Sequence, residues 1–188
     1  MSKRTNHKTA IVVAGMWSTN IGNAFFQLGA QYIMSQAAPS FKVNLLADHL
    51  GYWQYGEKQE PKNSARLLDH INADYVVLSG SVLTYSFPEL WANTLKIYKE
   101  HKIRVILLGV GQFDYSKNET SVCRDILKEF PPYAFISRDS LTFENFKGIA
   151  EHSYNGIDNA YFLPMAYPKI NLDYPQYIVL NFDKGPEP

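Results

Sequence analysis

The sequence predicts an α/β fold, a Rossmann-like open parallel sheet with helices on both faces. Short apolar runs alternate with helical patterns over units of roughly thirty residues, the spacing of βαβ crossovers. The run Asp74–Ser79 is continuous and rich in β-branched residues, as expected of a strand buried on both faces. Hydrophobic residues make up 46% of the 188 residues and charged residues 19%, which supplies a core and argues against disorder.

The first half of the chain gives three strands. The apolar run Ile11–Ala14 is followed by a helical pattern over Asn23–Ala37, which ends before Pro39. A second strand is expected at Phe41–Ala47 and the third at Asp74–Ser79. Between them, Ser64 is placed to cap a short helix over residues 65–71.

Glycine and proline mark the ends of the later elements. Gly80 and Ser81 are expected to break the third strand, and residues 109–111 (Gly-Val-Gly) to end a fourth strand at Ile103–Leu108. A fifth strand is expected at Ala134–Ser137. The helices between them are expected at Glu89–His101, after Pro88; at Thr120–Phe130, before Pro131; and at Leu141–Lys147, before Gly148.

This pattern divides the chain into two parts. Residues 9–165 are expected to form the Rossmann-like domain. Residues 166–188 are expected to be an irregular linker followed by a strand at Tyr177–Phe182, which would open a second domain. The alternative is that this last strand returns to the edge of the one sheet.

Composition excludes several classes of protein. The net charge is +0, with 18 basic and 18 acidic residues, so we expect no nucleic-acid partner. No segment approaches the roughly 20 apolar residues of a membrane span, and the charged start is unlike a signal peptide. The single cysteine, Cys123, fits a reducing compartment and a packing role, so the sequence predicts a cytoplasmic protein. The five histidines belong to no spaced metal motif, and no metal site is predicted.

Four polar turns follow directly after predicted strands. In an open parallel sheet, ligands bind at the carboxyl ends of the strands, near the point where the strand order reverses. We therefore expect these turns to line a ligand-binding cleft, although no catalytic residue is assigned. The candidate ligand-binding residues are Asn20, Gly22, Asn23, Gly80, Ser81, Gly109, Gly111, Gln112, Arg138, Asp139, Ser140 and Asp158.

Each candidate also has a structural interpretation. The turn before the first helix is either a ligand-facing helix N-terminus or a plain connection. Asp139 or Ser140 can cap the helix that follows, while Arg138 either reaches an anionic ligand or forms a salt bridge that holds the turn. Asp158 is either a polar ligand contact or the cap of a turn.

The order of these turns resembles the N-terminal half of the polysaccharide pyruvyl transferase family. The resemblance spans roughly Ile11 to Leu163 and departs from the family pattern at two positions: Asn23 replaces the usual acidic residue, and Ser81 interrupts a glycine run. The matching segments, in chain order, are Asn20-Ile-Gly-Asn23, Leu78-Ser-Gly-Ser-Val-Leu83, Leu108-Gly-Val-Gly-Gln112, Ile136-Ser-Arg-Asp-Ser140 and Asp158-Asn-Ala-Tyr-Phe-Leu163.

The resemblance implies a two-domain enzyme similar to the glycosyltransferase B architecture. Such enzymes transfer pyruvate from phosphoenolpyruvate, a donor substrate and not a bound cofactor, to a sugar hydroxyl of a cell-surface polysaccharide. This chain would supply the N-terminal domain and contact a glycan or lipid-linked sugar acceptor. Two alternatives stay open: a glycosyltransferase-like enzyme that uses a nucleotide sugar, and a non-catalytic module that binds a glycan or a protein partner.

Overall fold

The described residues form one parallel sheet. The computed structural model describes residues 7–15, 17, 20–47 and 67–167. Its sheet has six parallel strands in the order β2-β1-β3-β4-β5-β6, which confirms the Rossmann-like fold. The strands are β1 (Thr9–Ala14), β2 (Lys42–Ala47), β3 (Tyr75–Leu83), β4 (Arg104–Gln112), β5 (Ala134–Ser137) and β6 (His152–Asn155).

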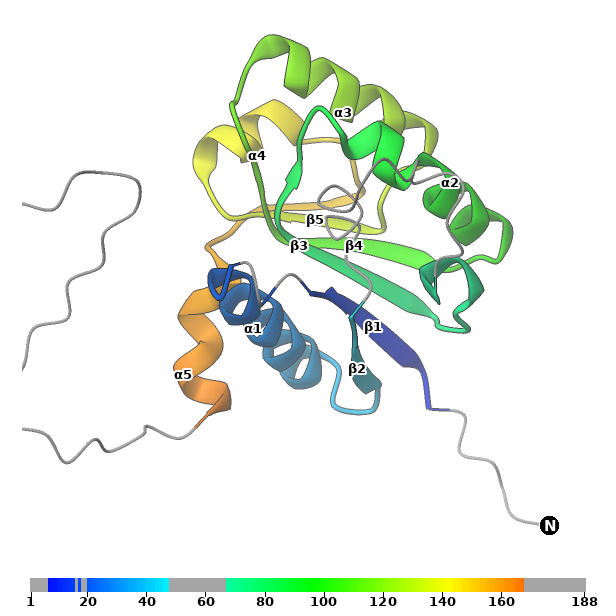
Figure 1. The fold of residues 1–188 in the computed structure, drawn as a ribbon, viewed down its shortest axis with the longest axis vertical. Helices are drawn as coiled ribbons and strands as arrows, with labels where there is room; N and C mark the ends of the chain where they lie inside the picture. The colour runs from blue at the N-terminus through cyan, green and yellow to red at the C-terminus, as the bar shows by residue number, and fades with distance from the viewer. Residues whose placement is uncertain (1–6, 16, 18–19, 48–66, 168–188) are drawn as a thin grey trace, which may run out of the picture.

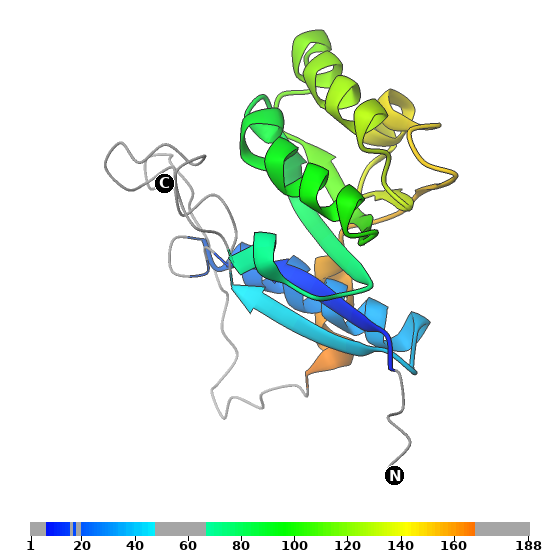
Figure 2. The same ribbon diagram turned by 90° about the vertical axis from the view of Figure 1, so that its right-hand side faces the viewer.

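Helices cover both faces of the sheet (Figure 1). One face carries α1, and the short elements η4 and α5 pack beside it; the other carries α2, α3 and α4 (Figures 1 and 2). The helices are α1 (Gly22–Ala37), α2 (Phe87–Glu100), α3 (Lys117–Glu129), α4 (Ser140–Phe146) and α5 (Leu163–Ala166), and the single-turn 3₁₀ elements are η3 (Leu67–His70) and η4 (Asn159–Phe162).

The core has two apolar layers, one on each face. The alternation of side chains along β3 sends Val76 and Leu78 toward α2 and α3, and Val77 toward α1. The larger layer contains Phe87 and Trp91 of α2, with their ring centroids 6.3 Å apart. Both central strands, β3 and β4, are buried over nearly their whole length, as the continuous apolar run predicted for β3.

The expectation that glycines end the third and fourth strands is wrong. β3 continues through Gly80 and Ser81 to Leu83, and β4 continues through Gly109 and Gly111 to Gln112. Gly80 and Gly109 have φ values of 78° and 60°, and the register of the β3–β4 pair shifts at this point before pairing resumes. A glycine with positive φ forms a bulge within a strand as readily as it ends one.

Other boundaries also differ from the sequence-based expectation. β6, η4 and α5 are not among the elements predicted from the sequence. Of the short helix expected over residues 65–71, the structure describes residues 67–71, and these hold the 3₁₀ turn η3. Residues 48–66 and 168–188, including the strand expected at Tyr177–Phe182, lie outside the described residues.

Helix α3 begins three residues before the expected position because Ser116 caps it and Glu119 supports the turn before it. Ser116 is the N-cap, and its side chain accepts a hydrogen bond from the backbone N–H of Glu119 at 3.0 Å. The Glu119 carboxylate reaches back to accept from the N–H of Tyr115 at 2.9 Å. This Ser-x-x-Glu spacing starts a helix even though the first turn has little apolar character.

Cys123 is a packing residue, as predicted. The side chain is fully buried on α3, and its Sγ donates a hydrogen bond to the carbonyl oxygen of Thr84 at 3.2 Å. Burial raises the pKa of the Cys123 thiol to about 12, and the neighbouring Glu119 carboxylate adds to this rise.

Stability should therefore fall steeply in alkaline solution. In the unfolded chain the thiol ionises near pH 8.5, so above about pH 9 the unfolded state has lost a proton that the native state keeps. The free energy of unfolding should then decrease by up to about 1.4 kcal/mol per pH unit from this group. Urea titrations of the parent and the Cys123→Ala variant from pH 8 to pH 10.5 would measure it. The variant should show the shallower decline, and parallel curves would contradict the buried-thiol explanation.

Candidate functional site

The carboxyl edge of the sheet contains the predicted site residues, which fall into two neighbouring groups. The strand order reverses between β1 and β3, so this is the topological switch point. One group lies here, after β1 and on β3. The other lies on β4, β5 and the segment after β6. The two groups border each other, because β3 and β4 are neighbouring strands and Gly80 of β3 pairs with Val110 of β4.

The turn before α1 satisfies its own backbone. The Asn20 Oδ1 accepts from the N–H of Gly22 at 2.9 Å, and the Asn20 carbonyl accepts from the N–H of Asn23 at 3.0 Å. The N–H of Ala24 bonds to the carbonyl oxygen of Ile21 at 3.0 Å. These helix N–H groups are therefore not available to an anion in this conformation. The exposed Asn20 side chain serves as an Asx-turn acceptor.

Two buried polar side chains lie at the switch point. Gln27 of α1 is 1% exposed; its Oε1 accepts from the N–H of Gly15 at 3.0 Å and from the indole N–H of Trp17. These bonds fix the amide orientation, and they leave Nε2 with no hydrogen-bond partner among the described residues. The Oγ of Ser79 on β3, which is 3% exposed, likewise has none. Sequence reasoning missed both residues.

The glycines at this edge make room for side chains of the same chain. A Cβ at Gly80 would overlap the ring of Phe26, and one at Gly109 would overlap the amide of Asn159. A Cβ at Gly111 would overlap the guanidinium of Arg138. Within the described structure, side chains of the protein therefore already fill the space that these glycines leave open.

Arg138, Gly111 and Asp158 are brought together. The Arg138 Nη1 is 3.5 Å from the Asp158 Oδ2, and the two side chains are 27% and 28% exposed. Asp158 also caps η4, since its Oδ1 accepts from the N–H of Ala160 at 2.9 Å. The salt-bridge and capping interpretations of these two residues are both confirmed. The long ion pair leaves guanidinium N–H groups able to bind an anion.

The residues after Arg138 hold the turn into α4. Asp139 is the N-cap: its Oδ1 accepts from the Thr142 N–H at 2.7 Å, and its Oδ2 accepts from the Thr142 hydroxyl at 2.8 Å. Tyr115 Oη donates to the same carboxylate at 3.2 Å. Ser140 Oγ accepts from the Asn155 amide at 3.1 Å. The capping role expected of Asp139 is confirmed, and its carboxylate is fully engaged.

The loop after β4 is organised by the buried Glu119. Its carboxylate accepts from the backbone N–H groups of residues 113, 114 and 115 and from the Gln112 amide. Gln112 is 1% exposed and also bonds to Thr120 and Asn145. In this conformation the Gln112 side chain is therefore part of the loop's support and does not face outward.

A second contact joins the loops after β3 and β4. The Tyr85 hydroxyl lies 2.5 Å from the Ser116 hydroxyl, and Asp114 is close to both residues. The carboxylate of Asp114 raises the pKa of Tyr85, and the hydrogen bond from Tyr85 lowers the pKa of Asp114. Both groups are solvent-exposed, so this contact positions the loops without a large effect on stability.

The described residues set some limits on chemistry. Across residues 7–47 and 67–167, apart from 16, 18 and 19, no three His, Cys, Asp or Glu side chains are close enough together to hold a metal ion. Within the same ranges, none of the helices combines the length and hydropathy of a membrane span.

The fold is that of a doubly wound, Rossmann-like α/β protein, with Arg138 at the carboxyl edge of its sheet. Comparisons of the chain with family models, curated proteins and solved structures found no match.

The fit between Gly109 and Asn159 is open to a direct test. In Gly109→Ala the methyl group would overlap the Asn159 amide and the residue would keep φ at 60°, so we expect a loss of about 2–4 kcal/mol in the free energy of unfolding. Gly148→Ala is the matched control, since Gly148 has φ 82° but open space around it; it should lose about 1 kcal/mol. Chemical denaturation measures both. Equal losses would show that backbone strain alone matters at Gly109.

Proposed function

We propose that this chain is the Rossmann-like domain of a polysaccharide pyruvyl transferase-like enzyme, which transfers pyruvate from phosphoenolpyruvate to a sugar hydroxyl. The proposal rests on the order of the strand-end segments from Asn20 to Leu163, which resembles that family. The six-stranded parallel sheet is compatible with it, because the resemblance implies an architecture built from two Rossmann-like halves. A cytoplasmic location belongs to the same proposal.

The proposed anion-binding site rests on the position of Arg138. Its guanidinium lies at the carboxyl end of β5, with Gly111 making room for it and Asp158 as its carboxylate partner at 3.5 Å. Both phosphoenolpyruvate and a lipid-linked sugar carry anionic groups that a guanidinium binds in bidentate fashion. We propose that Arg138 binds such a group.

The two polar groups at the switch point fit a hydroxyl-rich acceptor. The Gln27 Nε2 can donate a hydrogen bond, and the Ser79 hydroxyl can donate or accept one. Both atoms are buried in the present conformation, so an acceptor would reach them only after neighbouring groups move. We assign this group to the acceptor and the Arg138 group to the anion.

The test is an assay of the full-length protein with phosphoenolpyruvate and a panel of glycan acceptors, with release of inorganic phosphate as the readout. Arg138→Gln should lower kcat/KM by about tenfold to a hundredfold, the loss expected for one charged hydrogen-bonding contact. Lys147→Gln, which removes an exposed cation paired with Glu144 on α4, should leave the rate unchanged.

Two results would overturn the proposal. The first is an absence of phosphate release with every acceptor, together with saturable binding of a nucleotide sugar by calorimetry, which would favour the glycosyltransferase-like alternative. The second is equal activity of Arg138→Gln and the parent, which would limit Arg138 to its ion pair with Asp158.

A further inference from the structure

A cavity lies at the amino-terminal edge of the sheet, opposite the edge that carries the candidate site. It has a volume of about 400 Å³ and lies beside the start of β4, between the C-terminal ends of α2 and α3. This volume is within the range of about 300–1,000 Å³ that is typical of small-molecule sites. Nothing in the proposed transferase reaction uses this edge of the sheet.

The inner wall of the cavity is apolar. Leu95 and Tyr98 of α2 are buried, as are Ile103 and Val105 at the start of β4. The ring of Phe130, at the end of α3, is partly buried and closes the far side. Such a wall favours an aromatic or aliphatic ligand group.

The mouth of the cavity is cationic. Lys99, Lys102 and Arg104 line it, and none of the ten lining residues is acidic. Lys99 is already engaged, because its Nζ donates to the carbonyl oxygen of Glu129 at 3.2 Å and lies over the Phe130 ring. That contact complements the negative end of α3. Lys102 lies at the C-terminal end of α2, where a cation is favoured by the helix dipole, whereas Arg104 is on β4 and lies at no helix end.

The Arg104 guanidinium is held in place by aromatic residues. Its Nη1 donates to the Tyr75 hydroxyl at 2.9 Å, and its Cζ lies 4.9 Å from the centroid of the Tyr133 ring. Within the described part of the chain, no carboxylate forms an ion pair with Arg104. A guanidinium that is stacked and oriented in this way, but not neutralised, is suited to an anion.

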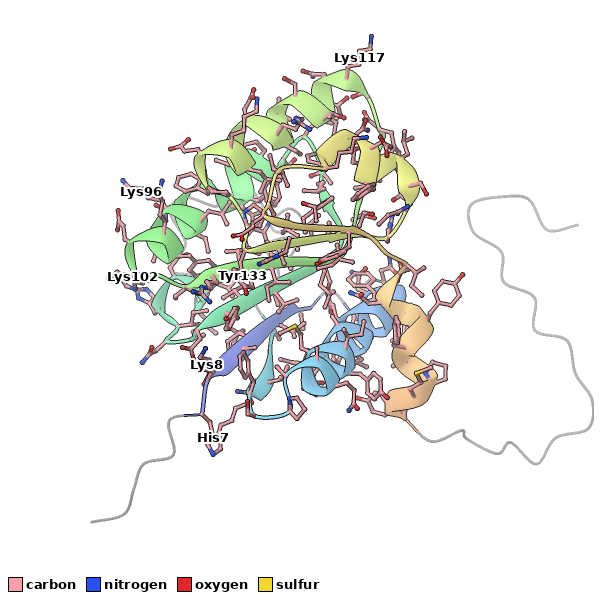
Figure 3. The ribbon with its side chains drawn as sticks, turned by 180° about the vertical axis from the view of Figure 1, so that it is seen from behind. His7, Lys8, Lys96, Lys102, Lys117 and Tyr133 are labelled. Carbon is pink, nitrogen blue, oxygen red and sulfur yellow. The ribbon has the colours of Figure 1, made fainter. Side chains whose placement is uncertain are left out.

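Lys102 occupies a position at which glycine is normal. It directly follows the C-cap of α2 with φ at 60°, and the N–H of Ile103 bonds back to the carbonyl oxygen of Tyr98 at 2.8 Å. Helices commonly end with glycine at this left-handed position, and a lysine there carries backbone strain. The side chain is exposed and has no ion pair among the described residues (Figure 3).

We propose that this cavity binds a small anionic amphiphile, with its apolar group against Leu95, Ile103 and Phe130 and its acidic group on Lys102 and Arg104. The apolar wall supplies burial, and the two cations select for a carboxylate, phosphate or sulfonate over a neutral molecule of the same shape. The site is independent of the proposed transferase reaction, because the two lie at opposite edges of the sheet.

The test uses the full chain and an aromatic anion, anilinonaphthalene sulfonate, whose fluorescence rises in an apolar site. Neutral phenylnaphthylamine is the matched probe without the acidic group. We expect saturable one-to-one binding of the anion and at least about fivefold weaker binding of the neutral probe, as the loss of a charged contact implies.

The key variant is Lys102→Gly, because glycine suits a φ of 60° and the change should not weaken folding. It should weaken binding of the anion by about fivefold to tenfold, and Arg104→Gln should do the same. Lys96→Gln is the control: it removes an equal charge from an exposed position of α2 that does not line the cavity (Figure 3), and it should leave the affinity unchanged.

Three outcomes would overturn the proposal. One is binding that does not saturate. Another is equal affinity for the charged and the neutral probe. The third is an equal loss of affinity in Lys102→Gly and Lys96→Gln. That result would mean that the anion responds to the overall charge of α2 and does not contact Lys102.

Discussion

The packing of Asn159 between α1 and β4 is the contact on which the carboxyl edge depends. Its Nδ2 donates to the carbonyl oxygen of Leu108 at 2.8 Å, inside the protein. Its side chain fills the space over Gly109, and its backbone carbonyl lies where a Cβ of Gly29 would be. One residue thus joins the end of the described chain to a helix near its beginning and to a central strand, and both glycines are required for the approach.

This contact also positions the candidate anion site. Asp158 directly precedes Asn159, so fixing Asn159 fixes the carboxylate that pairs with Arg138. The same region on the other face is held by Glu119, whose carboxylate gathers the N–H groups of the loop after β4. A buried carboxylate that accepts several backbone N–H bonds is a strong local constraint. The β4–β6 half of the edge is therefore rigidly supported from both faces.

The fold could be predicted from the sequence because periodicity and burial are local signals. The alternation of apolar runs and helical patterns gave the parallel sheet, and the Asp139 and Asp158 caps were visible as residue types next to their helices. β6 was missed because its four residues, His-Ser-Tyr-Asn, form a short edge strand with no apolar run. The sequence did not predict that β3 and β4 continue through their glycines, because glycine is common both at a bulge within a strand and at the end of a strand.

The site was harder to predict because its contacts join residues far apart in the chain. Gly109 looked like an approach point for a ligand, and only the fold reveals that Asn159, fifty residues later, occupies that space. Nothing in the sequence indicated that Gln27 and Ser79 would each have a polar atom unpaired among the described residues, since a lone amide or hydroxyl within an apolar pattern usually finds a hydrogen-bond partner. The Ser-x-x-Glu spacing of Ser116 and Glu119 was a signal in the sequence that would have placed the start of α3 correctly.

The structural and functional interpretations of Arg138 are compatible. An ion pair at 3.5 Å between two partly exposed side chains contributes about 0–1 kcal/mol, so little stability would be lost if the proposed anion drew the guanidinium away from Asp158. Asp158 would not be left without partners, because its Oδ1 still caps η4 and water can reach its carboxylate. The resting ion pair thus keeps Arg138 oriented at the edge of β5 in the absence of ligand. A tighter, buried pair in the same place would resist exchange, since breaking it would leave an uncompensated charge.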